Sequence, residues 1–453
     1  MGLIYFMKIS TMLISHFLFP LHEKLKKHHS VKLRKSLEKT QWLTSSEILA
    51  IQDQNLQDFI QTISTQVPYY QQIFKEKKLT VNDFKSVADL TKLPLLTKTL
   101  IRDNTTNLKR QGVTRFDKSN TGGSSGEPLI FYMGMNRVSH DVAAKWRATR
   151  WWDVDIGDKE LVIWGSPVEL GSQDKIRLFR DRLFSSKLLP AFAMNPSNLD
   201  QFITEIKQFK PNMLFGYPSA LSLIAERAKE TAMDLSQLGI KVVFVTSERL
   251  YEHQRKLIST IFNAPVANGY GGRDAGFIAH QCPKGKMHLS AEHLIVELLD
   301  QAGNPVKLGE MGEVTITHLC SEDFPFIRYQ TGDIAAFDTE PCDCGRGLPV
   351  LKEIHGRTTD FIKAYDGTLM HGLALIYILR EIALLKQFKI IQESIEKTQI
   401  LLVSNEIITD ELKQQIREKF KQRLGELVEI EVQQVEKIEC EKSGKFRYVV
   451  SHI

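Results

Sequence analysis

The feature that most constrains this chain is a run dense in glycine and hydroxyl residues, Ser119-Asn-Thr-Gly-Gly-Ser-Ser-Gly-Glu-Pro128. Its backbone N–H groups and hydroxyls suit phosphate oxygens, which predicts a nucleotide-phosphate loop. An ordinary P-loop is not expected, because Glu127 and Pro128 follow Gly126 where that motif needs Lys and then Ser or Thr. By composition alone, such a run is as often a flexible surface loop. The extended apolar segment 128–132 that follows it favours a loop that joins elements of a folded sheet.

Length and composition indicate a soluble globular protein of two or three domains. The chain has 453 residues, of which 42% are hydrophobic and 25% are charged, so neither a disordered nor a collagen-like protein is indicated. Five cysteines are too few for a disulfide framework, and Cys342 and Cys344 are too close in sequence for an ordinary bridge. We therefore expect a reducing, cytoplasmic setting.

The N-terminal segment carries part of the net charge of +5. Basic and histidine residues cluster between His22 and Lys35 on an expected helix, which could contact acidic lipid, although a solvated helix face is the more common meaning of a charge run. Residues 1–20 are apolar but are interrupted by Lys8 and His16, so they fall short of a spanning helix, and no signal-peptide cleavage pattern follows them. We expect a packed or peripheral amphipathic segment that could weakly touch the inner face of the membrane, and no nucleic-acid binding.

Hydrophobic periodicity predicts an α/β protein with a large multi-subdomain N-terminal lobe and a small α+β C-terminal domain. Residues 1–115 are expected to form a helical lead-in to the large lobe. Between 116 and 355, short apolar strands such as 213–216 alternate with helices, which favours mostly parallel sheets. From residue 294 the pattern becomes that of an antiparallel, β-rich subdomain. Residues 356–453 then have the size of one small domain.

Further polar clusters follow the ends of expected strands and helices. They lie at 245–250, 268–274, 327–333 and 443–447, and Gly356-Arg357 stands at the junction between the two lobes. Each of them taken singly could be no more than a turn or a cap. Their order along the chain is more specific than any one of them.

Together these segments resemble the adenylate-forming superfamily of acyl-CoA synthetases, peptide-synthetase adenylation domains and luciferases, and in particular its phenylacetate-CoA ligase and capsular polysaccharide biosynthesis branch. The resemblance covers nearly the whole chain, including Gln41-Trp42, Val67-Pro-Tyr-Tyr70 and Leu93-Pro-Leu-Leu-Thr-Lys98 of the lead-in. It implies a ligase that uses ATP and Mg²⁺ to convert a small carboxylic acid to an acyl-adenylate, with release of pyrophosphate. The acyl group would then pass to coenzyme A, or else to an amine or hydroxyl acceptor, with polysaccharide or cell-envelope biosynthesis as the setting.

The same resemblance assigns roles to individual residues. Asp274 stands where the family has a Glu associated with magnesium, Asp333 would bind both ribose hydroxyls, and Lys445 would reach the α-phosphate and the substrate carboxylate. A mobile ammonium and a metal ion neutralise the negative charge that develops when a carboxylate attacks the α-phosphate. An exposed tail lysine is the alternative for Lys445. Tyr270 would stack on the adenine, with Gly271 as its neighbour, and Arg357 would contact the nucleotide at the hinge of a mobile small domain. The other expected nucleotide contacts are Thr121, Gly122, Gly123, Ser124, Ser125 and Gly126 at the phosphates, and Ser247, Glu248 and Arg249 beside the adenine.

Two positions depart from the family pattern. Glu127 stands where the family commonly has Lys, and Thr359 stands where many relatives carry Asp two residues after the hinge Arg. These departures bear on pyrophosphate handling and on the swing of the small domain. A catalytically degenerate nucleotide- and zinc-binding scaffold therefore stays open, as does a membrane-surface nucleotide sensor that relies on residues 1–35. The acyl-pocket candidates are Trp164, Tyr217, Pro218 and Asn268.

A second constellation, independent of ATP, predicts a structural zinc site. Cys282 and His288 are six residues apart, and Cys342-Asp-Cys344 lies further on, next to Gly345. Two such ligand pairs on separate loops would supply a Cys₃His tetrahedron that clamps the β-rich region and leaves no open position for catalysis. Buried, unpaired thiols are the alternative.

Overall fold

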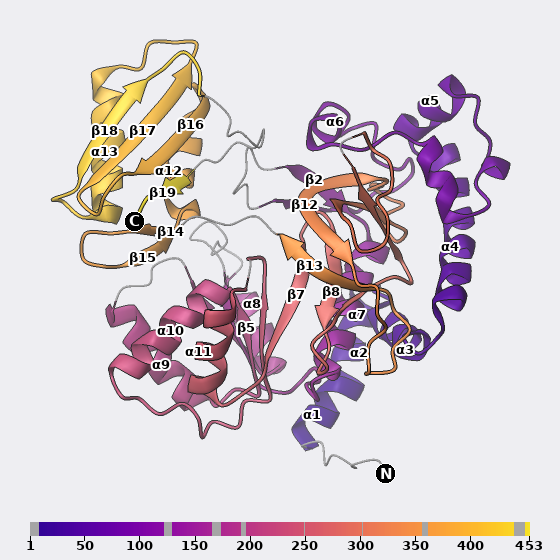
Figure 1. Cartoon of the computed structure of the whole chain (residues 1–453), viewed down its shortest axis with the longest axis horizontal. Coiled ribbons are helices and arrows are strands. Elements are labelled where there is room, and N and C mark those ends of the chain that lie inside the picture. Colours follow the sequence, from indigo (N-terminus) through magenta and orange to yellow (C-terminus); the bar gives the residue numbers. More distant parts are fainter. Residues whose placement is uncertain are drawn as a thin grey trace.

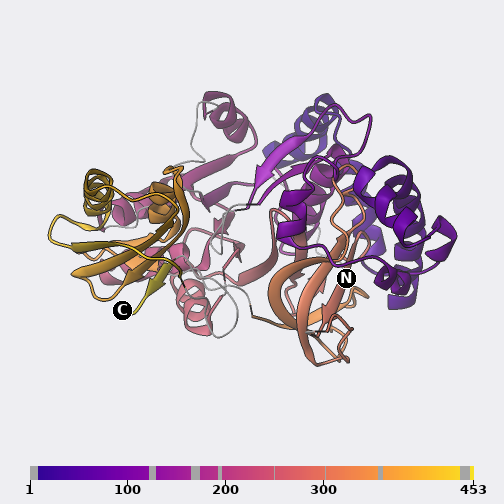
Figure 2. The same ribbon diagram turned by 90° about the horizontal axis from the view of Figure 1, so that it is seen from above.

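Two lobes, each with its own β-sheet, make up the computed structural model of this chain (Figure 1). Among the described residues the large lobe holds an 11-stranded sheet and the C-terminal lobe a 4-stranded one. The helical lead-in and the C-terminal lobe lie at opposite ends of the molecule in both views (Figures 1 and 2). The expected α/β class is confirmed. The structure describes residues 9–121, 129–164, 174–191, 196–248, 250–300, 302–355, 361–438 and 449–453.

The lead-in is helical, as the periodicity predicts. Its longest helix, α4, begins at a capping box in which the Thr44 hydroxyl accepts from the Glu47 N–H and the Glu47 carboxylate accepts from the Thr44 N–H. α4 ends before Pro68, since the residue that precedes a proline is driven into an extended conformation. No helix that the structure describes is both long and apolar enough to cross a bilayer. The elements are α1 (Ile9–Leu13), the π-helical turn η1 (Ile14–Leu18), α2 (Phe19–Leu25), α3 (Ser30–Thr40), α4 (Ser45–Gln66), α5 (Pro68–Glu76), the 3₁₀ turns η2 (Val81–Asp83) and η3 (Val87–Lys92), and α6 (Lys98–Asp103).

The end of the lead-in is hydrogen-bonded to the central sheet. Leu96 N–H donates to the carbonyl of Arg328 at 2.9 Å, and Gln330 N–H donates to the carbonyl of Leu96 at 3.0 Å. The buried guanidinium of Arg328 donates to the carbonyl of Leu93 and forms a bidentate pair with Glu297. The segment 93–96 thus lies beside the strand that carries Asp333.

The glycine-rich run lies between two paired strands, as its flanks predict. β1 (Asp117–Asn120) and β2 (Ile130–Met133) are antiparallel, and residues 122–128 between them lie outside the described residues. Thr121 closes the base of the loop, because its N–H donates to the Leu129 carbonyl at 3.0 Å and its hydroxyl accepts from the Leu129 N–H at 2.9 Å. The helix α7 (Met135–Arg150) follows β2.

One half of the large sheet is parallel, in the order β7-β6-β5-β3-β4. Every residue of β5 and β6 is buried, which is typical of strands covered on both faces. Helices of this half pack their apolar faces on those strands. The elements are β3 (Glu160–Trp164), α8 (Asp174–Leu183), β4 (Ser186–Pro190), α9 (Pro196–Phe209), β5 (Met213–Gly216), α10 (Pro218–Glu230), β6 (Val242–Thr246), α11 (Glu252–Phe262) and β7 (Val266–Gly272).

The antiparallel half continues the same sheet beyond β7, in the order β7-β8-β9-β13-β12-β11-β10. The β-rich region expected from residue 294 onward is therefore joined to the parallel strands by hydrogen bonds rather than packed as a sheet of its own. Its orange strands are strongly curved when seen from above (Figure 2). The elements are β8 (Gly276–Gln281), β9 (Met287–Leu289), β10 (Leu294–Leu299), β11 (Met311–His318), β12 (Tyr329–Phe337) and β13 (Val350–His355).

The C-terminal lobe is a small α+β unit with its own core. Its sheet has the order β18-β17-β16-β19, and Thr409 caps the charged helix α13 by accepting from the Leu412 N–H. The elements are β14 (Phe361–Lys363), β15 (Leu369–His371), α12 (Leu373–Arg380), β16 (Leu385–Gln392), β17 (Lys397–Ser404), α13 (Asp410–Leu424), β18 (Glu429–Gln434) and β19 (Val449–Ser451).

Candidate nucleotide site and metal centre

Several of the predicted site residues lie where neighbouring parallel strands end. Trp164 ends β3, Tyr217 follows β5, and Ser247 follows β6. Because these strands are parallel neighbours, their carboxyl ends share one edge of the sheet, which is where open α/β sheets bind ligands. Two of the acyl-pocket candidates, Trp164 and Tyr217, stack there with ring centroids 4.4 Å apart.

Tyr270 and Asp333, which are 63 residues apart in sequence, are in direct contact. The Tyr270 hydroxyl donates to Asp333 Oδ2 at 3.1 Å. Their strands, β7 and β12, are four places apart in the sheet, which in a flat sheet would separate them by about 19 Å. The hydrogen bond therefore requires the sheet to curl, and the curl brings together two segments for which the sequence predicts contacts to the adenine and to the ribose.

Asp274 has a tyrosine partner of the same kind. The Tyr329 hydroxyl donates to Asp274 Oδ2 at 2.6 Å, and Asp274 Oδ1 accepts from the Ala275 N–H at 3.1 Å. Asp333 and Asp274 are thus each held by a tyrosine hydroxyl from a distant part of the sequence. Sequence reasoning missed Tyr329, since nothing in its local pattern pairs it with a residue 55 positions away.

Arg137 of α7 supports the turn that carries Asp274. This side chain is 1% exposed, and its Nη2 donates to the carbonyls of Arg273 and Asp274 at 3.3 and 3.1 Å. Its Nε donates to Asp141 Oδ2 at 3.0 Å. Sequence reasoning missed this network as well, because charged residues spaced by four on a helix usually form its solvated face.

His140 and His318 approach the same carboxylate and form with it a grouping that resembles a metal site. His140 Nδ1 and His318 Nε2 each lie 3.8 Å from Asp141 Oδ1. The Cys320 N–H, however, donates to His318 Nδ1 at 3.3 Å, so Nε2 must carry the ring proton and points a donor at Asp141. Burial alone would raise the pKa of Asp141, but Arg137 and the two imidazoles outweigh burial and hold that pKa well below its usual range. We interpret the group as an ion-pair network that holds Arg137.

Buried histidines make the stability of the large lobe pH-dependent. Burial lowers the pKa of His280 and of His293 to about 3, against 6.5 for the free side chain. Between pH 6.5 and about 3 the unfolded chain binds more protons at these sites, so the free energy of unfolding should decrease as the pH falls, by about 1.4 kcal/mol per pH unit for each histidine. Urea unfolding at pH 7.5 and pH 5.5 measures this slope.

Two variants test whether His280 contributes to the slope of the free energy of unfolding against pH. His280→Phe should flatten the pH dependence, whereas His253→Phe, at an exposed position, should leave it unchanged. The same slope in wild type and His280→Phe would contradict the assignment.

Glu248 has a structural partner at the edge of the sheet. Its Oε2 accepts from the Ser219 hydroxyl at 2.6 Å and from the Ser219 N–H at 3.3 Å, in the first turn of α10. A carboxylate at this place satisfies donors that the helix leaves unpaired and favours the positive end of the helix dipole. Ser247 beside it has φ 72°, a left-handed conformation uncommon outside glycine and often found at functional sites.

Gly271 has a packing role that needs no ligand. A Cβ at this position would lie 2.1 Å from the Gly276 carbonyl oxygen across the β7–β8 hairpin, so only glycine fits. Of the other acyl-pocket candidates, Pro218 begins α10 and Asn268 lies in β7. The predicted positions that lie outside the described residues are Gly122, Gly123, Ser124, Ser125, Gly126, Glu127, Arg249, Arg357, Thr359 and Lys445.

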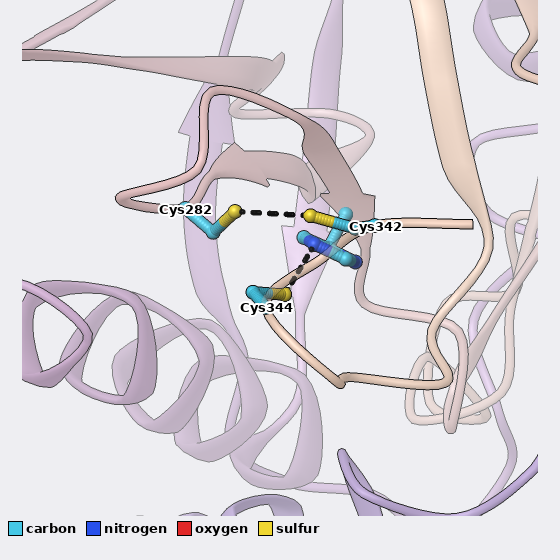
Figure 3. Close-up of side chains that lie close together, drawn as sticks. Cys282, Cys342 and Cys344 are labelled. Atoms are coloured by element: carbon cyan, nitrogen blue, oxygen red, sulfur yellow. Dashed lines mark hydrogen bonds between the residues drawn. The ribbon is translucent and has the colours of Figure 1, made fainter. Parts of the chain in front are cut away.

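The four predicted metal ligands meet in one cluster (Figure 3). Cys282 Sγ lies 3.6 Å from Cys342 Sγ, Cys344 Sγ lies 3.2 Å from His288 Nε2, and the four ligand atoms are all within 4.8 Å of one another. Sulfurs bound at 2.3 Å to a tetrahedral zinc are about 3.8 Å apart, close to the observed separation. The sequence interpretation places all four ligands on loops, whereas His288 lies in strand β9.

The protonation pattern of the cluster suits a metal. His288 Nδ1 faces the Leu348 carbonyl at 3.2 Å and donates to it, which leaves the lone pair of Nε2 directed at the cluster. Burial lowers the pKa of His288 to about 4, so its ring is neutral at pH 7. Burial also raises the pKa of the Cys342 thiol to about 12. The raised pKa means that a buried thiolate is unfavourable here without a positive charge beside it. A bound metal ion supplies that charge and deprotonates its thiol ligands.

Comparison with known proteins gives relatives along most of the chain. The family model described as the CapK C-terminal domain matches residues 362–452. Protein CapK of Staphylococcus aureus is 23% identical over 414 residues, which cover 90% of this chain and 90% of that protein. A phenylacetate-coenzyme A ligase of Thermus thermophilus is 24% identical over 336 residues, which cover 71% and 72% of the two chains.

Solved structures share the fold. A 2-hydroxyisobutyryl-CoA ligase in complex with 2-HIB-AMP and CoA superposes with a TM-score of 0.66 at 19% identity and covers 91% of each chain. The same enzyme in its postadenylation state superposes with a TM-score of 0.60. The resemblance to adenylate-forming proteins of the phenylacetate-CoA ligase and capsular polysaccharide branch is confirmed.

Proposed function

Because this chain is a relative of CapK and the phenylacetate-coenzyme A ligases and has the fold of adenylate-forming ligases, we propose that it activates a small carboxylic acid with ATP. The products of this step are an acyl-adenylate and pyrophosphate, and the acyl group then passes to coenzyme A. A degenerate scaffold is not favoured, since the phenylacetate-coenzyme A relatives and the structural neighbours are named as ligases.

The observation that carries the proposal is the meeting of Tyr270 with Asp333 and of Tyr329 with Asp274. Each carboxylate oxygen can accept more than one hydrogen bond, so a tyrosine partner fixes the carboxylate without using up its acceptor capacity. In the proposed site Asp333 accepts the two ribose hydroxyls while Tyr270, anchored at its own hydroxyl, offers its ring to the adenine. Asp274, fixed through Tyr329 and through Arg137 on its carbonyl, is the residue that would hold Mg²⁺, which supplies positive charge for the phosphates.

Carboxylate-dependent exchange of labelled pyrophosphate into ATP tests the adenylation step. A panel of aromatic and short-chain acids should include at least one that supports exchange. In the proposed mechanism the Lys445 ammonium neutralises charge on the attacking carboxylate and the α-phosphate, so Lys445→Ala should abolish exchange while the surface variant Lys413→Ala retains it. ATP binding without exchange for any acid in the panel would instead support the scaffold.

The acyl acceptor needs a separate measurement. With an acid that supports exchange, added coenzyme A should lose its free thiol in proportion to the AMP formed. If AMP forms only when an amine or a hydroxyl compound is supplied, the acceptor is not coenzyme A. The match to CapK over 90% of both chains supports polysaccharide or cell-envelope biosynthesis as the setting of the reaction.

We also propose that the cluster of Cys282, His288, Cys342 and Cys344 holds a structural zinc ion. Freshly purified protein should contain about one zinc per chain, and Cys342→Ser should lose the metal and lower the midpoint of thermal unfolding. Cys320→Ser, at a cysteine outside the cluster, is the matched control and should keep its zinc. Metal analysis that finds no zinc in the wild-type protein would refute the proposal.

A further inference from the structure

The first described helical segment, α1-η1-α2, carries apolar side chains on both its buried and its exposed side. Its buried side is mixed: Ile14 and Phe19 are 8% and 7% exposed, while Thr11 donates to Asp158 at 3.0 Å and Glu23 accepts from Ser30 at 2.5 Å. Its solvent side is apolar, with Ile9 78%, Phe17 69% and Leu25 76% exposed. A helix on the surface of a soluble protein normally keeps its solvent side polar, so an exposed apolar side of this length marks an interaction face.

The exposed apolar residues form a regular stripe. Ile9, Leu13, Phe17, Leu21 and Leu25 are all exposed and recur every four residues. In an uninterrupted α-helix this spacing would drift around the axis, but the π-helical turn η1 has wider i→i+5 bonds, such as Phe19 N–H to Ile14 carbonyl. The wider turn offsets the drift and keeps the stripe on one side.

The segment that contains the stripe and the helix after it carries a net positive charge. Residues 9–40 contain seven lysines and arginines and two glutamates, a net +5 that equals the net charge of the whole chain. Neither glutamate is exposed, whereas Lys32, Lys35 and Lys39 are exposed at helical spacing on α3, the helix that follows. The residue that follows α8, Phe184, packs on the buried Phe19 of α2 with ring centroids 5.7 Å apart, and Leu183 next to it is 43% exposed.

We propose that this face, the apolar stripe of α1-η1-α2 with the lysines of α3, docks on an anionic phospholipid bilayer. The segment lies in the interface plane rather than across the membrane, since it is too short to span. Acidic headgroups complement the lysines, and Phe17 and its neighbours insert at the boundary between the headgroups and the acyl chains. The chain that leads into the stripe, Gly2-Leu-Ile-Tyr-Phe-Met7, is uncharged, which is consistent with this occupant.

Flotation with vesicles tests the proposal on the full-length protein. Wild type should float with phosphatidylglycerol-containing vesicles at low salt and much less with pure phosphatidylcholine. Phe17→Glu/Leu21→Glu should lower the bound fraction about tenfold or more. The matched control, Ile407→Glu/Leu427→Glu, changes two apolar residues at 87% and 72% exposure on the C-terminal lobe and should bind as wild type does.

The lysines have their own variant. Lys32→Gln/Lys35→Gln/Lys39→Gln should weaken binding to anionic vesicles about tenfold or more and leave binding to neutral vesicles unchanged. Wild-type protein that stays with the vesicle-free fraction at low salt would overturn the proposal, as would an equal loss in the control. Sedimentation without lipid tests whether a second copy of the chain occupies the face instead. If the wild type is a dimer, does not bind vesicles and becomes a monomer in Phe17→Glu/Leu21→Glu, the face belongs to that second copy.

Discussion

Asp333→Ala is expected to reduce carboxylate-dependent pyrophosphate exchange roughly a hundredfold, with most of the loss in the apparent affinity for ATP. The proposed role of Asp333 is to accept two ribose hydroxyls, and hydrogen bonds to a charged acceptor contribute about 1.5–3 kcal/mol each. The variant also removes the acceptor to which the Tyr270 hydroxyl donates at 3.1 Å in the wild-type protein. Exchange rates measured over a range of ATP concentrations separate the loss in affinity from a loss in rate.

Two further variants interpret that result. Tyr270→Phe keeps the ring and the carboxylate and removes only the hydroxyl between them, so the loss should be about tenfold. Asp300→Ala removes an exposed carboxylate in a turn and should leave exchange unchanged. If Asp333→Ala keeps the wild-type affinity for ATP and the wild-type unfolding midpoint, Asp333 does not bind the ribose hydroxyls.

Glu292→Ala should give the largest loss of stability, about 3–5 kcal/mol in the free energy of unfolding. Glu292 and Arg147 are each 1% exposed and their charged atoms are 2.6 Å apart, so removing the carboxylate leaves a guanidinium uncompensated in the interior. Thr40 also donates to Glu292 at 2.9 Å, which ties α3 and α7 to the start of β10. Urea unfolding measures the loss.

The comparison that isolates the buried charge is the double variant Arg147→Met/Glu292→Leu. It replaces the pair by apolar side chains of similar volume and should be much more stable than Glu292→Ala. Glu230→Ala breaks the exposed ion pair with Arg227 and should cost no more than about 0.5 kcal/mol. A loss below about 1 kcal/mol for Glu292→Ala would mean that water reaches Arg147.

Local patterns in the sequence predict much of this fold. The run 213–216 is strand β5, the charged segment 410–424 is α13, and the break at Val67-Pro68 separates α4 from α5. These features depend on neighbours in sequence, such as apolar periodicity, caps and the conformational limits of proline. The cluster of Cys282, His288, Cys342 and Cys344 is predictable for a similar reason, since the types and spacing of these residues can be read in short segments.

The contacts that assemble the candidate site, in contrast, join residues that are far apart in the sequence. Tyr329 meets Asp274 only because one sheet continues from parallel to antiparallel strands and curls, and no local pattern encodes a curl. The polar face of α7 misleads for a related reason. Arg137, His140 and Arg147 on a helix predict a face in water, yet all three are buried, because Asp141 and Glu292 supply the opposite charges within the protein.

The hydrogen bonds between Leu96 and the backbone on either side of Tyr329 make the lead-in a mechanical part of the large lobe. Trimming the amino end back to residue 115 would strip an edge from the strand that presents Asp333 and leave the Arg328 guanidinium without one of its acceptors. The lead-in helices therefore brace this strand, and we expect substitutions near Leu93 to loosen first the backbone that carries Asp333, the residue proposed to bind the ribose.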